Sequence, residues 1–216
     1  MAFVEIEHVR QKFGWDCGLA CLEMICRWAG NANNSCYDQW DFTNRSIWSI
    51  DLLVHGRRLG LPLVLTSKVV QPETRRCQMF YSCTTDQDNG RISDLSALAR
   101  ADGHLMQISN CPVSVLEAHL NSRQPIIVLV NSNVLKCRDC TGKVGKFAKT
   151  LISNVFFGHY VLLVGASVHS DTVQYKDPGK KHETCKTTVR NFERARLCSG
   201  TDEDLIWHET PLIAHE

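Results

Sequence analysis

The sequence predicts an α+β fold in which helices pack on one side of a largely antiparallel sheet. Two observations lead to this prediction. Apolar residues in the first half recur mostly with a helical period, whereas the second half holds short apolar runs rich in β-branched residues, which are typical of strands. In addition, one helix near the N-terminus is apolar on nearly all sides, so we expect it to lie buried against the sheet.

This buried helix is expected from Gly18 to Ala29, with Cys17 at its start. Its only charges are Glu23 and Arg27, which are four residues apart and are expected to pair on one exposed strip. A thiol in the first turn lies where unpaired N–H groups and the helix dipole favour the thiolate. The position suits a nucleophile, although an isolated cysteine is more often a small buried core residue.

Further elements of the first half follow from the same periodicity. The expected helices cover Ile47–Gly60, Ser93–Ala101 and Pro112–Ser122, and the expected short strands cover Leu61–Thr66 and His104–Ile108. Ser46 is expected to cap the first of these helices. In the last one, Ser114 and Glu117 have the spacing of a capping box.

The second half is expected to supply most of the sheet. Its predicted strands are Pro125–Asn131, His159–Ala166, Thr172–Asp177 and Leu205–His208, and an amphipathic helix is predicted over Thr188–Leu197. The length suits one domain over residues 1–216. Polar stretches at about 67–91 and 132–157 are expected to be surface insertions.

Two of these strands bring a histidine and a carboxylate together. Val173, Tyr175 and Asp177 alternate on one face of their strand. If the strands form a hairpin folded about His169, His159 becomes a diagonal neighbour of Asp177 on the same face. A carboxylate at that place holds the imidazole in one tautomer and orients its other nitrogen.

The residue types and their order then predict the chemistry of a cysteine hydrolase. Cys17 is the expected nucleophile, His159 the base and later the acid, and Asp177 the orienting group. The side-chain amide of Gln11 is expected to stabilise the oxyanion together with the backbone N–H of Cys17.

These residues resemble two related groups of proteins. The chain resembles the bacteriocin-processing peptidase-like branch of the papain-like superfamily in four places. These are Gln11, Asp16-Cys17-Gly18-Leu-Ala-Cys21-Leu, Gly158-His159-Tyr-Val-Leu and Asp177-Pro178. The chain also resembles the eukaryotic guanylyl cyclase domain-containing proteins in four segments. These are Trp15-Asp-Cys-Gly-Leu-Ala-Cys21, Arg45-Ser-Ile-Trp-Ser-Ile-Asp51, Ile127-Val-Leu-Val-Asn-Ser132 and Gly200-Thr-Asp-Glu-Asp-Leu205. The resemblance spans roughly residues 8 to 208. It implies a papain-like cysteine peptidase fold with Gln11, Cys17, His159 and Asp177 in the active-site positions.

Three functions remain open at this point. The first is a papain-like thiol peptidase that cleaves a peptide, isopeptide or related acyl bond. The second is the guanylate cyclase of the family name, which ordinarily needs carboxylates that hold Mg²⁺ or Mn²⁺. The only close acids are Asp202, Glu203 and Asp204, expected in a solvated loop, and the sequence has no phosphate-cradling glycine loop. The third is a non-catalytic binding module on the same fold.

The eleven cysteines are odd in number and follow no disulfide framework, which favours a reducing compartment, either cytosol or nucleus. Cys137 and Cys140 form a CxxC pair, which is half of a zinc site. Cys185 and His182 could complete that site, but nothing in their spacing requires it. We therefore expect free thiols and no bound cofactor, with a metal or redox pair as the alternative.

Charge and hydropathy restrict the partners. The net charge of +1 gives no reason to expect binding to nucleic acid or to a membrane surface. The apolar runs are too short to span a bilayer, and the first eight residues carry acids where a signal peptide needs bases. The expected partner is therefore a protein or peptide substrate.

Overall fold

The computed structural model describes residues 3–31, 35–41, 47–69, 86–140 and 156–209, and it confirms the α+β class. Within these ranges the strands are β1 (Leu63–Ser67), β2 (Leu105–Gln107), β3 (Ile126–Asn131), β4 (Gly158–Ser167), β5 (Thr172–Lys176), β6 (Cys185–Thr187) and β7 (Leu205–His208). They form a seven-stranded sheet in the order β2-β1-β7-β3-β4-β5-β6. The β1–β2 pair is parallel and the other pairs are antiparallel, so the sheet is largely antiparallel as predicted.

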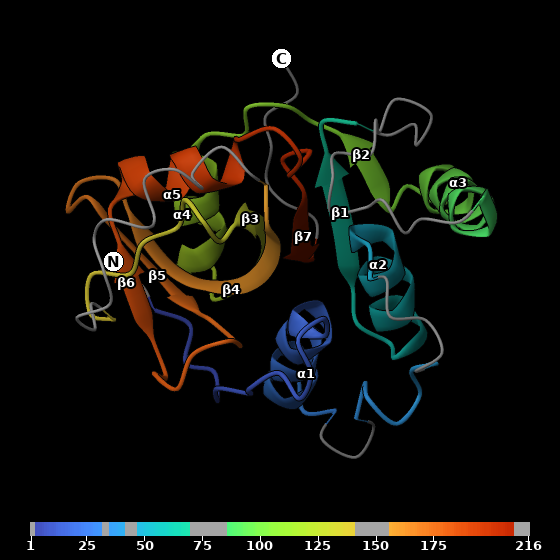
Figure 1. Ribbon diagram of the computed structural model, residues 1–216, viewed down its shortest axis with the longest axis horizontal. Coiled ribbons are helices and arrows are strands. Elements are labelled where there is room, and N and C mark those ends of the chain that lie inside the picture. Colours follow the sequence, from blue (N-terminus) through green and yellow to red (C-terminus); the bar gives the residue numbers. More distant parts are fainter. Residues whose placement is uncertain (1–2, 32–34, 42–46, 70–85, 141–155, 210–216) are drawn as a thin grey trace.

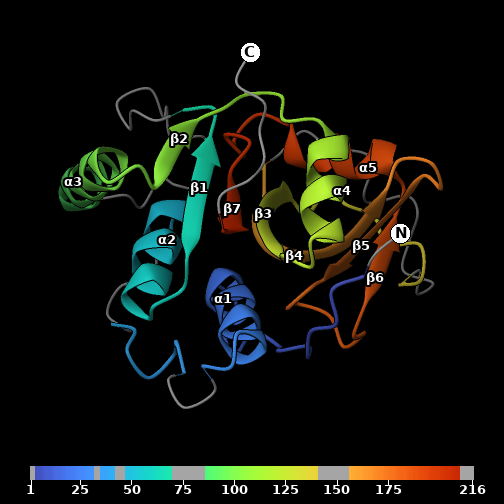
Figure 2. The same ribbon diagram turned by 180° about the vertical axis from the view of Figure 1, so that it is seen from behind.

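Five helices surround this sheet within the described residues. They are α1 (Cys17–Trp28), α2 (Ser49–Arg58), α3 (Asp86–Ala101), α4 (Val113–Asn121) and α5 (Val189–Arg196). Every residue of β3 is buried, so both faces of the central sheet are covered. Helix α5 lies in front of the strands in Figure 1, and α4 lies in front when the molecule is seen from behind in Figure 2. Helices therefore cover both faces of the sheet, and the prediction that they pack on one side was wrong. None of these helices has the length and apolar character that crossing a bilayer requires.

Helix α1 is buried as predicted, but its acidic residue lies elsewhere than expected. All residues from 17 to 26 are buried, and Glu23 is among them. The Glu23 carboxylate accepts hydrogen bonds from Arg27 Nε at 2.9 Å, Ser35 Oγ at 3.0 Å and the Cys36 backbone N–H at 2.9 Å. The expectation that Glu23 lies on an exposed strip was therefore wrong, because it ties the following loop to the helix. Burial raises the pKa of Glu23, but these hydrogen bonds outweigh it and leave the pKa below its ordinary value.

Two helices begin two or more residues away from their predicted starts. Helix α2 begins at Ser49, where the Trp48 backbone N–H donates to the Asp51 carboxylate at 3.0 Å. The expected Ser46 cap lies outside the described residues. Helix α3 begins at Asp86, well before the expected Ser93, so residues 86–91 of the expected first insertion are helical.

Two further expectations need correction. The predicted capping box of α4 is absent, because Pro112 precedes the helix and its N-cap makes no side-chain hydrogen bond. Glu117 instead accepts a hydrogen bond from the Val168 backbone N–H at 3.0 Å. The sequence also gave no indication of β6, whose three residues pair with β5 at the edge of the sheet.

Glu23→Gln is expected to destabilise the fold by about 1–3 kcal/mol, because the buried Cys36 N–H loses a charged acceptor. The matched control is Glu7→Gln. The Glu7 side chain is 71% exposed and lies 3.6 Å from Arg27, so its loss is expected to cost about 0.5 kcal/mol or less. Urea unfolding at neutral pH measures both.

The lowered pKa of Glu23 also fixes how this difference varies with pH. Its stabilising contribution is present above the ordinary value of 4.5 and is lost as the pH falls through the lower folded value. Equal destabilisation by the two substitutions at neutral pH would contradict the assigned role of Glu23.

Candidate active site

Cys17 is held close to β4 by an unusually near approach of α1. A Cβ atom at Gly18 would lie 2.7 Å from the Leu52 side chain of α2 and 3.1 Å from the Tyr160 side chain of β4, so a larger residue would force these buried side chains to shift. Because Gly18 allows this approach, the Tyr160 backbone N–H reaches the Cys17 Sγ atom at 3.5 Å. The nucleophile candidate thus lies beside the residue that follows His159.

His159 connects the thiol with the carboxylate. Its Nε2 atom lies 2.7 Å from Asp177 Oδ1, and Cys17 lies close enough to the imidazole to raise its pKa. Since Asp177 holds Nε2, Nδ1 is the ring nitrogen left for the contact with Cys17. The backbone N–H of Gly179 donates to the same Asp177 oxygen at 2.9 Å, which fixes the carboxylate just beyond the end of β5.

A β-bulge places these two side chains on the same face. Next to the β4–β5 turn, Ser167 pairs with Thr172 and Gly165 with Gln174. The register then shifts by one residue at Val164, so that Leu163 pairs with Tyr175. Continued by two residues, the shifted register sets Asp177 opposite Val161, as the hairpin prediction required. Without the bulge Asp177 would lie opposite Leu162 and face away from His159, because a one-residue slip moves every side chain to the other face.

The contacts stabilise the charged forms of both groups. Burial alone lowers the pKa of His159, but Asp177 and Cys17 outweigh it and raise the pKa from 6.5 to about 10. For Asp177, burial raises the pKa, whereas the contacts with His159 and the Gly179 N–H lower it below 3.8 on balance. At neutral pH the pair is therefore an imidazolium beside a carboxylate.

Gln11, the expected oxyanion donor, lies beside the loop that follows Asp177, with its side-chain amide turned toward Phe13. Its backbone N–H donates to the Pro178 carbonyl at 3.1 Å, which ties the N-terminal segment to the loop after Asp177. Its side-chain Oε1 lies 3.4 Å from the point that a Cβ atom of Gly179 would occupy. In this conformation Nε2 donates to the Phe13 carbonyl at 2.6 Å.

Asp16 is a residue of the site to which the sequence reasoning gave no role. Its carboxylate is fully buried and accepts from the backbone N–H groups of Lys12 and Phe13 and from the Tyr37 hydroxyl, each at 2.9 Å. It stands at the N-cap position of α1, yet its side chain turns back to the preceding loop rather than to the helix. The sequence signal for this role was an acidic residue directly before a helix. In the structure the Asp16 carboxylate fixes the loop between Gln11 and Cys17.

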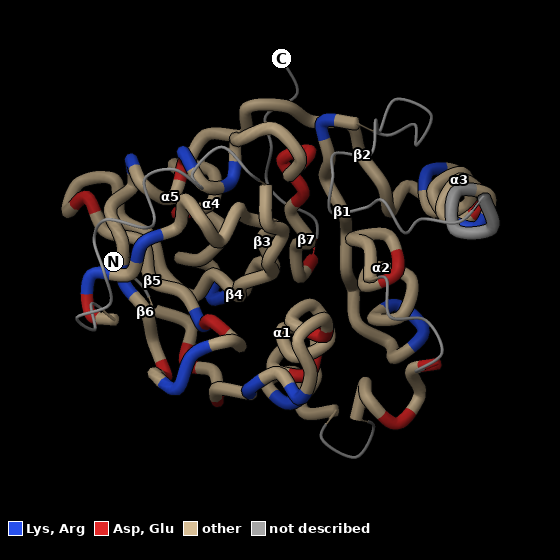
Figure 3. Tube along the Cα trace, in the orientation of Figure 1, with Lys and Arg blue, Asp and Glu red and all other residues tan. Residues whose placement is uncertain are grey.

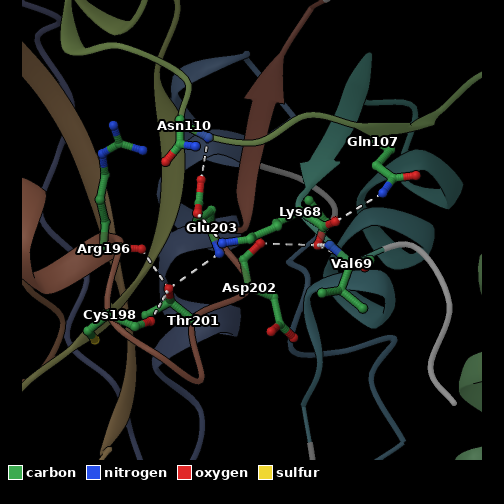
Figure 4. A network of polar contacts seen from close by, with 10 residues as sticks. Lys68, Val69, Gln107, Asn110, Arg196, Cys198, Thr201, Asp202 and Glu203 are labelled. Carbon is green, nitrogen blue, oxygen red and sulfur yellow. Dashed lines mark hydrogen bonds and ion pairs between the residues drawn. The ribbon is translucent and has the colours of Figure 1, made fainter. Parts of the chain in front are cut away.

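The acidic group at 202–204 is not a solvated loop. Figure 4 shows Glu203 between Lys68 and Asn110, and the carboxylate lies 3.2 Å from Lys68 Nζ and 2.5 Å from the Asn110 N–H. Asp204 is buried and accepts from Ser49 Oγ at 2.5 Å. These two carboxylates are thus engaged with different protein groups, which corrects the expectation of an exposed loop.

The cysteine pair gains one of its two suggested partners. The Sγ atoms of Cys137, Cys140 and Cys185 all lie within 4.8 Å of one another. Among the described residues His182 is not part of this group.

Comparisons with known proteins add the family and the fold. A family model described as "Guanylylate cyclase" matches residues 6–207. "Guanylyl cyclase 1" of Arabidopsis thaliana is 26% identical over 206 residues, which cover 94% of this chain and 75% of that protein. Among solved structures, a candidate C39-like peptidase from Bacillus anthracis is 12% identical, with a TM-score of 0.56 and 97% of each chain covered. A double glycine motif protease from an AMS/PCAT transporter, solved with its leader peptide, is 14% identical with a TM-score of 0.45, over 97% of this chain and 95% of that one. The likeness to the C39-like peptidase confirms the predicted papain-like fold.

Asp177→Asn is expected to destabilise the fold in a pH-dependent manner. The raised pKa of His159 means that its contribution is fully present below 6.5 and is lost as the pH rises through about 10. The lowered pKa of Asp177 means that its contribution is present above 3.8 and is lost as the pH falls. The stability difference from the wild type, measured by urea unfolding, should therefore be largest between those ordinary values and shrink toward alkaline pH. A difference that grows above neutral pH would contradict the pairing.

Proposed function

The chain belongs to the guanylylate cyclase family, and we propose that it is a papain-like cysteine hydrolase acting on a peptide, isopeptide or related acyl bond. The observation that carries the proposal is the series of contacts from Cys17 through His159 to Asp177. A thiol, an imidazole and an orienting carboxylate in that order are the groups that nucleophilic attack on a carbonyl requires. The family name and the peptidase fold both point to an enzyme.

In the proposed reaction, the proton of the Cys17 thiol already resides on His159, which is held as an imidazolium beside Asp177. The Cys17 thiolate then attacks the carbonyl carbon. The oxyanion accepts a hydrogen bond from the Cys17 backbone N–H, and from the Gln11 amide once that amide leaves the Phe13 carbonyl. His159 then gives its proton to the leaving amine, which leaves a thioester on Cys17. Finally His159 takes a proton from water and the water oxygen attacks the thioester carbonyl. The C–S bond then breaks, which releases the acid product and restores the Cys17 thiolate beside protonated His159.

Guanylate cyclase activity is the second candidate, because both the family description and the Arabidopsis relative carry that name. Forming cyclic GMP is phosphoryl transfer, which ordinarily uses carboxylates that hold divalent metal ions. Glu203 and Asp204 would have to release Lys68 and Ser49 before they could bind such an ion. The hydrolase is therefore the better supported of the two functions.

Selective modification of Cys17 by iodoacetamide tests the hydrolase proposal without knowledge of the substrate. We expect Cys17 to be modified at slightly acid pH, where an ordinary thiol reacts slowly because it titrates near about 8.5. His159→Ala should slow this modification by about 10²-fold or more, since it removes the base. Asp177→Asn should slow it less, and the double variant should lose little beyond His159→Ala, because the residues act as a unit. Mass spectrometry of the peptides measures each rate.

Cys198 is the internal reference in the same sample. It is half-buried, and burial raises the pKa of its thiol, so it should react only under more alkaline conditions. Equal modification of Cys17 and Cys198 at slightly acid pH would contradict the proposed nucleophile and favour a binding module.

A parallel assay with GTP and Mn²⁺ tests the cyclase. Cyclic GMP formation that survives Cys17→Ala but fails with Glu203→Gln would reverse the ranking.

A further inference from the structure

Three cysteines from two separate segments meet at the β6 edge of the sheet. Cys137 and Cys140 lie in the segment that follows β3, and Cys185 is the first residue of β6. Their three Sγ atoms lie within 4.8 Å of one another. We propose that these three thiolates bind a zinc ion.

The spacing of the sulfur atoms fits a shared metal ion. Tetrahedral zinc with Zn–S bonds of about 2.3 Å sets its sulfur ligands about 3.8 Å apart. The Cys140 and Cys185 sulfur atoms are 3.6 Å apart, close to that value. A disulfide would require about 2.05 Å. The longest separation in the group, at most 4.8 Å, needs to contract by only about 1 Å to complete the ligand triangle.

The backbone around the cluster is already organised for thiolates. The Arg138 N–H donates to the Lys186 carbonyl at 2.7 Å, which holds the Cys137–Cys140 turn against β6. Backbone groups of Asp139, Cys140 and Lys186 lie close enough to the Cys137 sulfur to favour its thiolate form. Such outer contacts orient metal-binding side chains and are a regular part of metal sites.

The burial and charge of the surroundings also suit the ion. Cys185 is fully buried, and Cys137 and Cys140 are partly buried against the hydrophobic core. Zinc with three thiolates carries a net charge of −1, so nearby cations stabilise it. Lys180 interacts electrostatically with Cys140, and Figure 3 shows basic positions on the chain around β5 and β6.

Three protein ligands leave one position of the tetrahedron for a solvent molecule or a small thiol. Among the described residues no fourth cysteine, histidine or carboxylate joins the cluster. The ion would fasten β6 to the turn that follows β3. Because Cys185 pairs with Tyr175, two residues before Asp177, the metal would also support the strand that leads into the candidate active site. This zinc site does not depend on the proposed hydrolase activity.

Metal analysis of the purified full-length chain tests the proposal. Protein produced with zinc in the medium should contain about one zinc ion per chain, as measured by elemental mass spectrometry. Cys140→Ser should lose most of that zinc, whereas Cys198→Ser, which changes a half-buried thiol outside the cluster, should keep it. Cys17→Ala should also keep its zinc, which separates this site from the proposed nucleophile.

A second measurement covers the case in which a cysteine variant fails to fold. Cobalt(II) added to reduced, metal-free wild-type protein should give thiolate-to-cobalt absorption with an intensity that corresponds to three sulfur ligands. Zinc should then displace the cobalt. Wild-type protein that neither carries zinc nor binds cobalt under reducing conditions would overturn the proposal, as would zinc that is retained after Cys140→Ser in a folded variant.

Discussion

The close packing of α1 between α2 and β4 is the constraint on which the candidate site depends. A Cβ atom at Gly18 would lie within 3.1 Å of the buried side chains of Leu52 and Tyr160, so a larger residue would force them to shift. This contact fixes the start of α1 against the start of β4, so that Cys17 meets His159 although 141 residues lie between them in the sequence. The helix can be held this way because residues 17–26 are all buried and the interior is densely packed.

Much of this arrangement could be predicted from local patterns. An apolar helix that opens on Cys17, an apolar strand at His159, and an alternating strand that ends near Asp177 are all visible in the sequence. The register of the hairpin was less certain, because the structure reaches it through a bulge at Val164. The adjacent Gly165 is compatible with a bulge, but a glycine inside a strand does not by itself fix the register. The three residues of β6 show no strand pattern of their own, since their pairing depends on β5 and on the turn around Cys137.

Buried carboxylates account for the acidic residues that sequence reasoning placed incorrectly or left without a role. Acidic residues are usually exposed, so Glu23 and Glu203 were expected at the surface. In the structure each is buried and accepts hydrogen bonds from a backbone N–H and a basic side chain, which offsets the cost of removing the charge from water. Asp16 follows the same principle with two N–H groups and a hydroxyl. These contacts link segments distant in sequence, and a periodic pattern along one segment carries no information about them.

The most direct test of Cys17 as a nucleophile is a comparison of protein termini and freed lysine amines in cells. Cells that lack the protein would receive either the wild type or Cys17→Ala, at matched abundance, and the termini would be identified by mass spectrometry. A cysteine hydrolase predicts a defined set of new termini or freed amines that appears with the wild type and is absent with Cys17→Ala. Identical sets in both cells, with both proteins folded and equally abundant, would contradict a hydrolytic role for Cys17.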